Sequence, residues 1–210
     1  FAYVDKNIAI QGEYGEIFQD SNVSFSNSNP SALVISSYIQ FDNLNLLSLY
    51  RNYDLEYDNP YQRSFSNYQR YKSTIFEDVY WLEDPVYSYL YTANPQPQAE
   101  EGFYFSSRYQ FHRSFVGYIN WDTWNRKADN TKYYRTVATI DWRPIFNFRI
   151  KLRQKWQQRG TFDVSHPSPY YSRETRVTSR LRLSNYNWLE LLYVNSYTTF
   201  SPRPRLTDNS

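Results

Sequence analysis

Two histidines are the first residues to consider for chemistry, because imidazole is the side chain that most often serves as a base near neutral pH. His112 falls in a predicted turn, and His166 lies in the loop segment 163–168 (DVSHPS). A nucleophile, a base and an orienting acid must converge in space, and neighbours along one loop do not provide that geometry. We therefore expect no enzyme activity and no catalytic residue.

Other ligand chemistry is equally sparse. The histidines are not spaced as metal ligands, and the chain has no cysteine. The pair Glu100-Glu101, with Glu83 and Asp84 elsewhere, offers oxygen atoms suited to calcium, but such pairs are more often solvated loop charges. Five glycines leave no phosphate-binding loop, and a formal net charge of +2 gives no basis for nucleic-acid binding. We expect no cofactor, no metal and no nucleic-acid partner.

The strongest pattern is an alternation between Ile145 and Gln157. Because side chains of a strand point to opposite faces in turn, this segment presents cations on one face and large apolar groups on the other. Gln154 is the one exception on the apolar side. Transmembrane β-strands of about 9–11 residues have this character, with one face toward lipid and one toward a wet lumen. We predict that the lipid-facing residues are Phe146, Phe148, Ile150, Leu152 and Trp156.

Neighbouring predicted strands extend the cationic face. The candidate lumen-lining residues are Arg135, Asp141, Arg149, Lys151, Arg153, Lys155, Arg176, Arg180 and Arg182. A cationic wall can select anions. Alternatively, these cations pair with carboxylates such as Asp122, Glu174 and Glu190 and simply fill the lumen, which would make the barrel plugged or structural.

The order of the elements is that of a meander. Strands are predicted at 33–41, 45–53, 74–81, 86–92, 103–111, 115–124, 132–142, 146–157, 173–183 and 188–199, with one or two more around Asn7–Phe18. Short connections (42–44, 112–114, 143–145, 184–187) alternate with longer ones (54–73, 93–102, 125–131, 159–172). This rhythm is typical of outer-membrane barrels. We predict an all-β fold, an antiparallel up-and-down transmembrane β-barrel or part of a larger one, with about 11–12 strands.

Composition is compatible with this fold. A mean hydropathy of −0.79 is too polar for a helical membrane protein but not for a barrel, whose lumen side is hydrophilic. The chain has 23 Tyr and 6 Trp, and eight of these residues lie near predicted turns, where an aromatic girdle would meet the membrane–water boundary: Trp121, Trp124, Tyr133, Tyr134, Trp142, Trp156, Tyr186 and Trp188. The alternative is a soluble, aromatic-rich β-sandwich that binds a glycan or a protein partner.

Three stretches resemble the barrel region of large Gram-negative outer-membrane proteins that carry helix-hairpin-helix repeats in their N-terminal portion. They are Leu46–Ser66, Gly102–Phe111 and Trp142–Trp156, and the most distinctive element is YRNY followed by Asn59-Pro60-Tyr61 and Phe65-Ser66. The helix-hairpin-helix portion does not occur in these 210 residues. The resemblance implies a location in the bacterial outer membrane and a barrel fold, and it implies little about activity.

The expected function is therefore a passive porin-like channel or an envelope scaffold. Its partners would be membrane lipid, other envelope proteins or further barrel strands. We assign residues 1–200 to the meander and residues 201–210 to a polar tail, and we expect the chain to be a fragment of a larger barrel. The segment Asp54–Ser73 is the best candidate for a constriction that folds inward.

Overall fold

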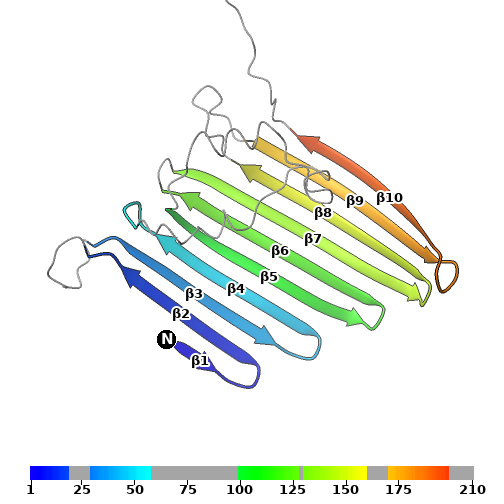
Figure 1. Ribbon diagram of the computed structural model, residues 1–210, viewed down its shortest axis with the longest axis horizontal. Coiled ribbons are helices and arrows are strands. Elements are labelled where there is room, and N and C mark those ends of the chain that lie inside the picture. The colour runs from blue at the N-terminus through cyan, green and yellow to red at the C-terminus, as the bar shows by residue number, and fades with distance from the viewer. Residues whose placement is uncertain (19–28, 58–98, 128–129, 160–169, 199–210) are drawn as a thin grey trace, which may run out of the picture.

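The structure is a computed structural model that describes residues 1–18, 29–57, 99–127, 130–159 and 170–198. These residues form one antiparallel sheet in which each strand pairs with the next along the chain (Figure 1). The strands are β1 (Ala2–Val4), β2 (Ile8–Glu16), β3 (Ser31–Gln40), β4 (Leu44–Tyr53), β5 (Glu100–His112), β6 (Phe115–Arg126), β7 (Thr131–Ile145), β8 (Phe148–Arg159), β9 (Tyr170–Arg182) and β10 (Trp188–Thr198). None of the described residues belongs to a helix long and apolar enough to cross a membrane.

Short connections join alternate strands at one end of the sheet, which we call the short-turn end (Figure 1). Between β3 and β4, for example, the Phe41 amide donates to the Leu44 carbonyl across a three-residue turn. The connection between β7 and β8 is shorter still, with only Phe146 and Asn147 between the strands. The remaining connections lie at the opposite end, as the meander requires.

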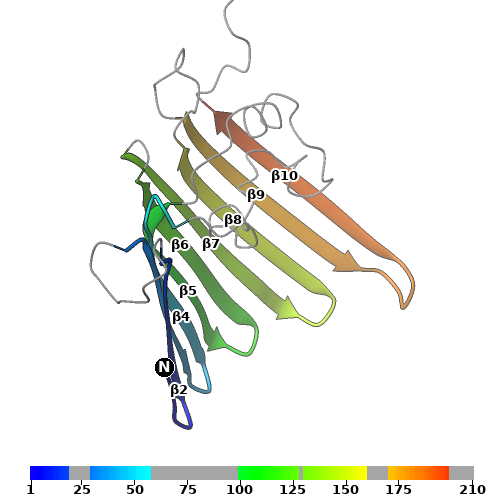
Figure 2. The same cartoon turned by 60° about the vertical axis from the view of Figure 1, so that its left-hand side comes forward.

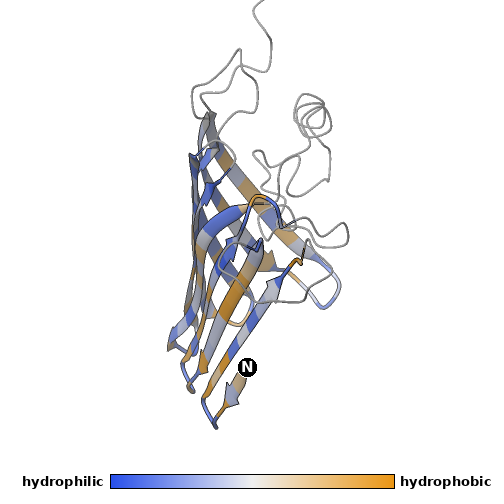
Figure 3. Cartoon of the chain, turned by 90° about the vertical axis from the view of Figure 1, so that its left-hand side faces the viewer, coloured by the Kyte–Doolittle hydropathy of each residue, from blue (hydrophilic) through white to orange (hydrophobic). Residues whose placement is uncertain are grey.

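The pairing register gives the sheet two chemically different faces. Figure 3 shows the alternation of hydrophilic and hydrophobic residues along the strands from which the two faces arise. On the apolar face, large hydrocarbon and aromatic groups are aligned across neighbouring strands; examples are Ile119 opposite Ala138, Ile140 opposite Leu152, and Leu152 opposite Val177. On the charged face, Asp141 lies opposite Lys151, and Lys155 lies opposite Glu174. Strand alternation maintains this division across the sheet because directly opposed residues point to the same face, and the two ladder irregularities, at Gln110/His112 and Trp142/Ile145, lie close to the short-turn end.

The sheet is also sheared and curved. A walk across directly opposed Cα partners leads from Tyr3 in β1 through Ile10, Ser37, Ser48, Phe105, Trp121, Thr136, Trp156 and Arg173 to Tyr197 in β10. Tyr3 lies one residue from the short-turn end of β1, whereas Tyr197 lies nine residues from the short-turn end of β10. The register has thus slipped by about one residue per strand, the ratio found in eight-stranded barrels of shear 8 and about 36° strand tilt. In Figure 2 β1 to β5 are seen close to edge-on while β8 to β10 face the viewer.

The fold confirms the predicted antiparallel meander at a coarse level. Each predicted strand in the described residues exists, although the strand expected at Phe146–Gln157 begins at Phe148 because Phe146 and Asn147 form the turn. The sheet is open in the structure, with β1 and β10 as its two edges, so closure into a barrel is not observed. Two predicted strands (74–81 and 86–92), the predicted inward-folding loop beyond residue 57 and the tail 201–210 lie outside the described residues.

One irregularity preserves the apolar face. The β5–β6 ladder carries a bulge between Gln110 and His112, which would reverse the facing of the residues beyond it. Phe111 nevertheless stays with the apolar set, because its ring lies 4.7 Å from that of Tyr109 and 5.3 Å from that of Phe115. A Cβ atom at Gly117 would come within 3.0 Å of the Phe111 ring, so the glycine makes room for it.

Candidate functional site: the charged face

All nine residues predicted to line a lumen lie on the charged face. Arg135 and Asp141 come from β7, whereas the others alternate along β8 and β9. Two pairs of arginines are directly opposed across the β8–β9 ladder: Arg149 with Arg180, and Arg153 with Arg176. Like charges in directly opposed positions are unfavourable unless a counter-charge or an ion intervenes. How each pair is compensated therefore decides what this face can do.

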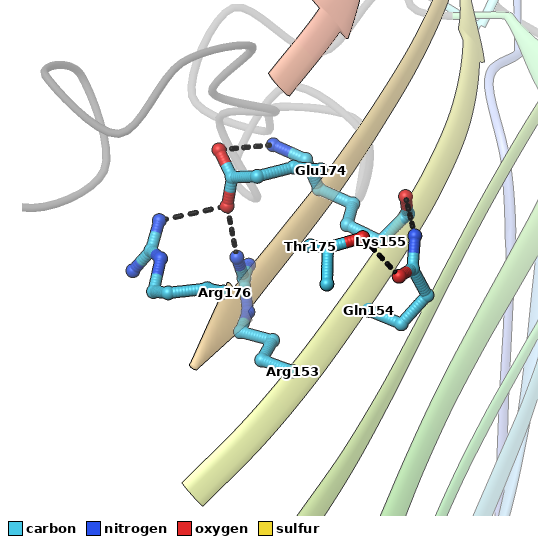
Figure 4. A network of polar contacts seen from close by, with 6 residues as sticks. All are labelled: Arg153, Gln154, Lys155, Glu174, Thr175 and Arg176. Carbon is cyan, nitrogen blue, oxygen red and sulfur yellow. Dashed lines mark hydrogen bonds and ion pairs between the residues drawn. The ribbon is translucent and has the colours of Figure 1, made fainter. Parts of the chain in front are cut away.

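A buried carboxylate compensates the second pair (Figure 4). Glu174 Oε1 accepts hydrogen bonds from Arg153 Nη1 and Arg176 Nη2, both at 2.8 Å. The Lys155 ammonium lies 4.0 Å from the other carboxylate oxygen, and the side chains of Lys155 and Glu174 are almost fully buried. Charge-assisted hydrogen bonds of this kind satisfy ions that have left water. The pairing with Glu174, which is one of the two alternatives drawn from the sequence, is thus present in the structure.

The first pair is compensated differently. Arg149 makes two hydrogen bonds to the Asp141 carboxylate, one of them from Nε at 2.8 Å, and Arg143 Nε lies 3.7 Å from the same group. Arg180, by contrast, has its nearest carboxylate, that of Glu190, at 3.8 Å, which is beyond hydrogen-bond distance. Its guanidinium instead lies over the Trp188 ring, 3.2 Å from the ring centroid. The two arginines share no carboxylate.

Lys151 is the second poorly compensated cation. It lies on β8 between Arg149 and Arg153, directly opposite Asp141 on one side and Thr178 on the other. Its side chain is exposed, and no carboxylate of the described residues lies within 4.0 Å of the ammonium. Among the described residues around β8 and β9, the seven cations predicted to line the lumen outnumber the carboxylates of Asp141, Glu174 and Glu190.

A second ion cluster on the same face was not expected from the sequence. Arg51 of β4, with its side chain 0% exposed, donates to Glu100 Oε1 at 2.6 Å and to Asp122 Oδ1 at 3.0 Å. Its guanidinium also lies 5.7 Å from the centroid of the Trp124 ring. In the sequence, Arg51 belongs to the YRNY motif that carries the family resemblance, and nothing in that motif indicates an ion cluster.

Aromatic rings and a glycine complete that cluster. Trp124 and Tyr133 stack with ring centroids 4.9 Å apart at an interplanar angle of 7°. A Cβ atom at Gly102 would lie 2.8 Å from the Thr123 carbonyl oxygen and 2.9 Å from Arg51 Cζ. Gly102 is therefore required by close approach and not by backbone conformation.

Two of the residues considered for other chemistry, Glu100 and His112, lie in the described part of the chain with different neighbours. Glu100 faces Arg51, whereas its neighbour Glu101 accepts a hydrogen bond from Tyr50 on the apolar side, so the two carboxylates point to opposite faces. His112 contacts Ser114 at 2.9 Å within the short turn. His166, Glu83 and Asp84 lie outside the described residues, and within the described ranges no group of three metal-ligating side chains comes together.

The predicted lipid-facing residues of β8 share the apolar face. Phe148, Ile150, Leu152 and Trp156 lie opposite Leu181, Ser179, Val177 and Arg173 of β9. Phe146 does not belong to this row, because it lies in the β7–β8 turn, where the Arg182 guanidinium is 5.6 Å from its ring centroid.

Neither a family model nor a curated protein matches this sequence. The resemblance to helix-hairpin-helix-containing outer-membrane proteins therefore stays a prediction, and any function must be argued from the two faces of the sheet.

Proposed function

We propose that this chain forms part of a β-barrel in the bacterial outer membrane and acts as a passive channel with a cationic wall. The apolar face would contact lipid and the charged face would line the lumen. The resemblance noted from the sequence is consistent with this location but does not carry the proposal.

The observation that carries the proposal is a single-layer sheet whose apolar face is open to its surroundings. Trp121, Ile140, Trp142 and Trp156 are each about two-fifths exposed, and Leu191 of β10 is 62% exposed. In a soluble β-sandwich such a row would pack against a second sheet at a spacing of about 10 Å. In a membrane, the acyl chains of the lipid would cover this apolar row, and no second protein layer would be needed.

The dimensions agree with a membrane-spanning role. From Phe148 to Trp156 the apolar row of β8 covers about 27 Å along the strand. At the tilt inferred from the register, its height along a barrel axis is about 20–22 Å, close to the ~25 Å apolar band of outer-membrane barrels. Tyr134, Trp142 and Trp156 lie near the two ends of this band, where an aromatic girdle is expected.

A scaffold role is the second candidate, and one observation favours it. The Arg51 and Glu174 clusters are buried and ion-paired, as expected of a lumen wall that is filled. The exposed and poorly compensated cations at the short-turn end favour the channel. Single-channel recording in planar bilayers separates the two: discrete conductance steps with anion preference support a channel, and a folded protein that never conducts supports a scaffold.

Lipid contact itself is tested by tryptophan quenching. The protein would be folded into vesicles of phospholipid brominated on the acyl chains, in variants that retain one tryptophan and carry phenylalanine at the other five. We expect Trp142 fluorescence to be strongly quenched and Trp124, which is buried on the charged face, to be quenched far less. Equal quenching of both, or none, would contradict the proposal and would favour the soluble binding module.

A further inference from the structure

The poorly compensated cations lie together near the short-turn end of β8 to β10. Arg180 is directly opposite Arg149, and Lys151 is directly opposite Thr178, the next residue of β9 on the same face. Directly opposed residues in an antiparallel pair have Cα atoms about 4.5–5.5 Å apart, and diagonal neighbours are about 7–8 Å apart. Three cationic groups and one hydroxyl therefore start from adjoining positions on one patch.

Arg180 is held in place without using its hydrogen-bonding capacity. Its guanidinium carbon lies 3.2 Å from the centroid of the Trp188 ring. No acceptor in the described residues is within hydrogen-bond distance of it, since Glu190 is 3.8 Å away. A planar guanidinium that rests on a ring and has no acceptor among the described residues is suited to an oxyanion that accepts two parallel hydrogen bonds.

The pair Arg153 and Arg176 has a shared carboxylate, which the pair Arg149 and Arg180 lacks among the described residues. Glu174 accepts from Arg153 and Arg176 at once, and in this way relieves their repulsion. Between Arg149 and Arg180 no carboxylate of the described residues takes this position, because Asp141 is bound on the far side of Arg149. A bound anion would make the same kind of bridge.

We infer that Arg180, Lys151 and Thr178, with Arg149 beside them, form a binding site for a phosphate group. Arg180 would donate in a bidentate manner, Lys151 would supply a point charge, and the Thr178 hydroxyl would donate one hydrogen bond. The side chains of Arg180 and Arg149 are about one-third exposed and Lys151 is exposed, so the site is accessible from the charged face. The inference deepens the proposed channel by naming the class of solute its wall would attract.

Equilibrium binding tests the site without requiring conductance. The full chain, refolded in detergent micelles at low ionic strength, would be titrated calorimetrically with inorganic phosphate and, separately, with glycerol phosphate. We expect saturable binding that Arg180→Gln and Lys151→Gln each weaken by about tenfold, which corresponds to ~1.4 kcal/mol. Tighter binding of glycerol phosphate would assign the site to an organic phosphate, and equal binding would assign it to the phosphate group alone.

Two further variants keep the test decisive. Arg173→Gln removes a cation from the same strand but from the apolar face, and it should change phosphate binding by less than about twofold. Trp188→Leu keeps every charge and removes only the ring under Arg180. Because Trp188 is 65% exposed, little packing is lost, and the variant should also weaken binding.

The absence of saturable phosphate binding by the folded protein would overturn the site, as would an equal loss in Arg173→Gln. Neither result would contradict the proposed barrel, because tryptophan quenching measures lipid contact independently of phosphate binding. Conversely, phosphate binding by a protein whose apolar face shows no lipid contact would support this site and contradict the channel.

Discussion

At the scale of single residues, the charged face is organised around ions that have lost their contact with water. Arg51 is the clearest case, because its guanidinium has no exposed surface and two carboxylates depend on it. Removing one member of a buried ion group leaves the others uncompensated, which costs more than the group contributes as a whole. The cost of such a change is therefore a sensitive measure of whether the face is folded as described.

We predict that Arg51→Met lowers the free energy of unfolding by about 3–5 kcal/mol. Glu100 and Asp122 would stay buried and would lose the hydrogen bonds that Arg51 donates to them. The measurement is urea unfolding in detergent micelles followed by tryptophan fluorescence. Arg113→Met, in the exposed β5–β6 turn, is the control and should stay within about 0.5 kcal/mol of the parent. Similar values for the two variants would contradict the buried cluster.

Gly102 supplies the second residue-scale prediction. An added methyl group at this position meets a backbone carbonyl oxygen and the Arg51 guanidinium at under 3 Å, and the backbone cannot move aside without disturbing the β5–β6 ladder. We expect Gly102→Ala to destabilise the protein by about 1–3 kcal/mol in the same urea experiment. Gly117→Ala meets only the edge of the Phe111 ring and should cost less. The reverse order would show that the cluster is looser than described.

At the scale of elements, strand alternation decides which face a new charge meets. Leu152 lies in the middle of β8 on the apolar face, between Ile140 and Val177. If this face contacts hydrocarbon, Leu152→Arg should cost about 2–4 kcal/mol of folding free energy in lipid vesicles. Asn120→Arg, on the charged face of β6, should cost less than about 1 kcal/mol. Equal costs would mean that both faces contact the same medium, and not hydrocarbon on one side and water on the other.

The ends of three strands are linked by one ion pair beyond the sheet. Asp54, which follows β4, accepts hydrogen bonds from the Ser31 amide and hydroxyl and from the Lys127 ammonium at 2.7 Å. Partial burial raises the pKa of Asp54, but the bonds from Lys127 and Ser31 outweigh it and hold the pKa below the ordinary 3.8. A carboxyl group with a depressed pKa stabilises the fold above its unfolded value and loses that contribution as the pH falls through its folded value.

We therefore expect Asp54→Asn to be less stable than the parent at about pH 7, and the difference to shrink at a pH well below the ordinary 3.8, as Asp54 becomes protonated. The difference should be under about 1 kcal/mol, because the side chain is 40% exposed and the pair is screened by water. Urea unfolding of both proteins at the two pH values measures it. Asp42→Asn, in the β3–β4 turn, controls for the loss of a surface charge, and a pH-independent gap would contradict the linkage.

The elements also show how far the sequence could be read. The alternation along β8 was sufficient to place Lys151, Arg153 and Leu152 on their correct faces, because facing is a local property of a strand. The Arg51 cluster could not be predicted in this way. Its partners are 49 and 71 residues away, so the contacts depend on the β4–β5–β6 register and not on any local spacing. The difference between the two arginine pairs could not be predicted either, because it depends on the positions that Glu174 and Asp141 take in the sheet.

At the scale of the whole molecule, the two edge strands, β1 and β10, determine whether the sheet can close. The register slips by about one residue per strand, so in a ten-stranded closed sheet Tyr3 would lie opposite a residue about ten positions before Tyr197. That position, Asn187, lies before the start of β10. The short β1 would then cover only the first residues of β10 and leave most of that strand without a partner on its second side.

Hydrocarbon provides no hydrogen-bond partners for the exposed edge of a strand, at a cost of several kcal/mol for each group. If the sheet spans a bilayer, Glu190–Thr198 must therefore be paired by a strand beyond the ten described here. We predict that in lipid vesicles the amides of β10 on its β9 side and on its second side are equally protected in hydrogen exchange followed by NMR. In an open sheet every second amide of β10 would instead exchange as fast as those of the turn 183–187. That alternating pattern would contradict closure, and with it the barrel, because an unpaired edge eleven residues long is tolerated in water but not in a membrane.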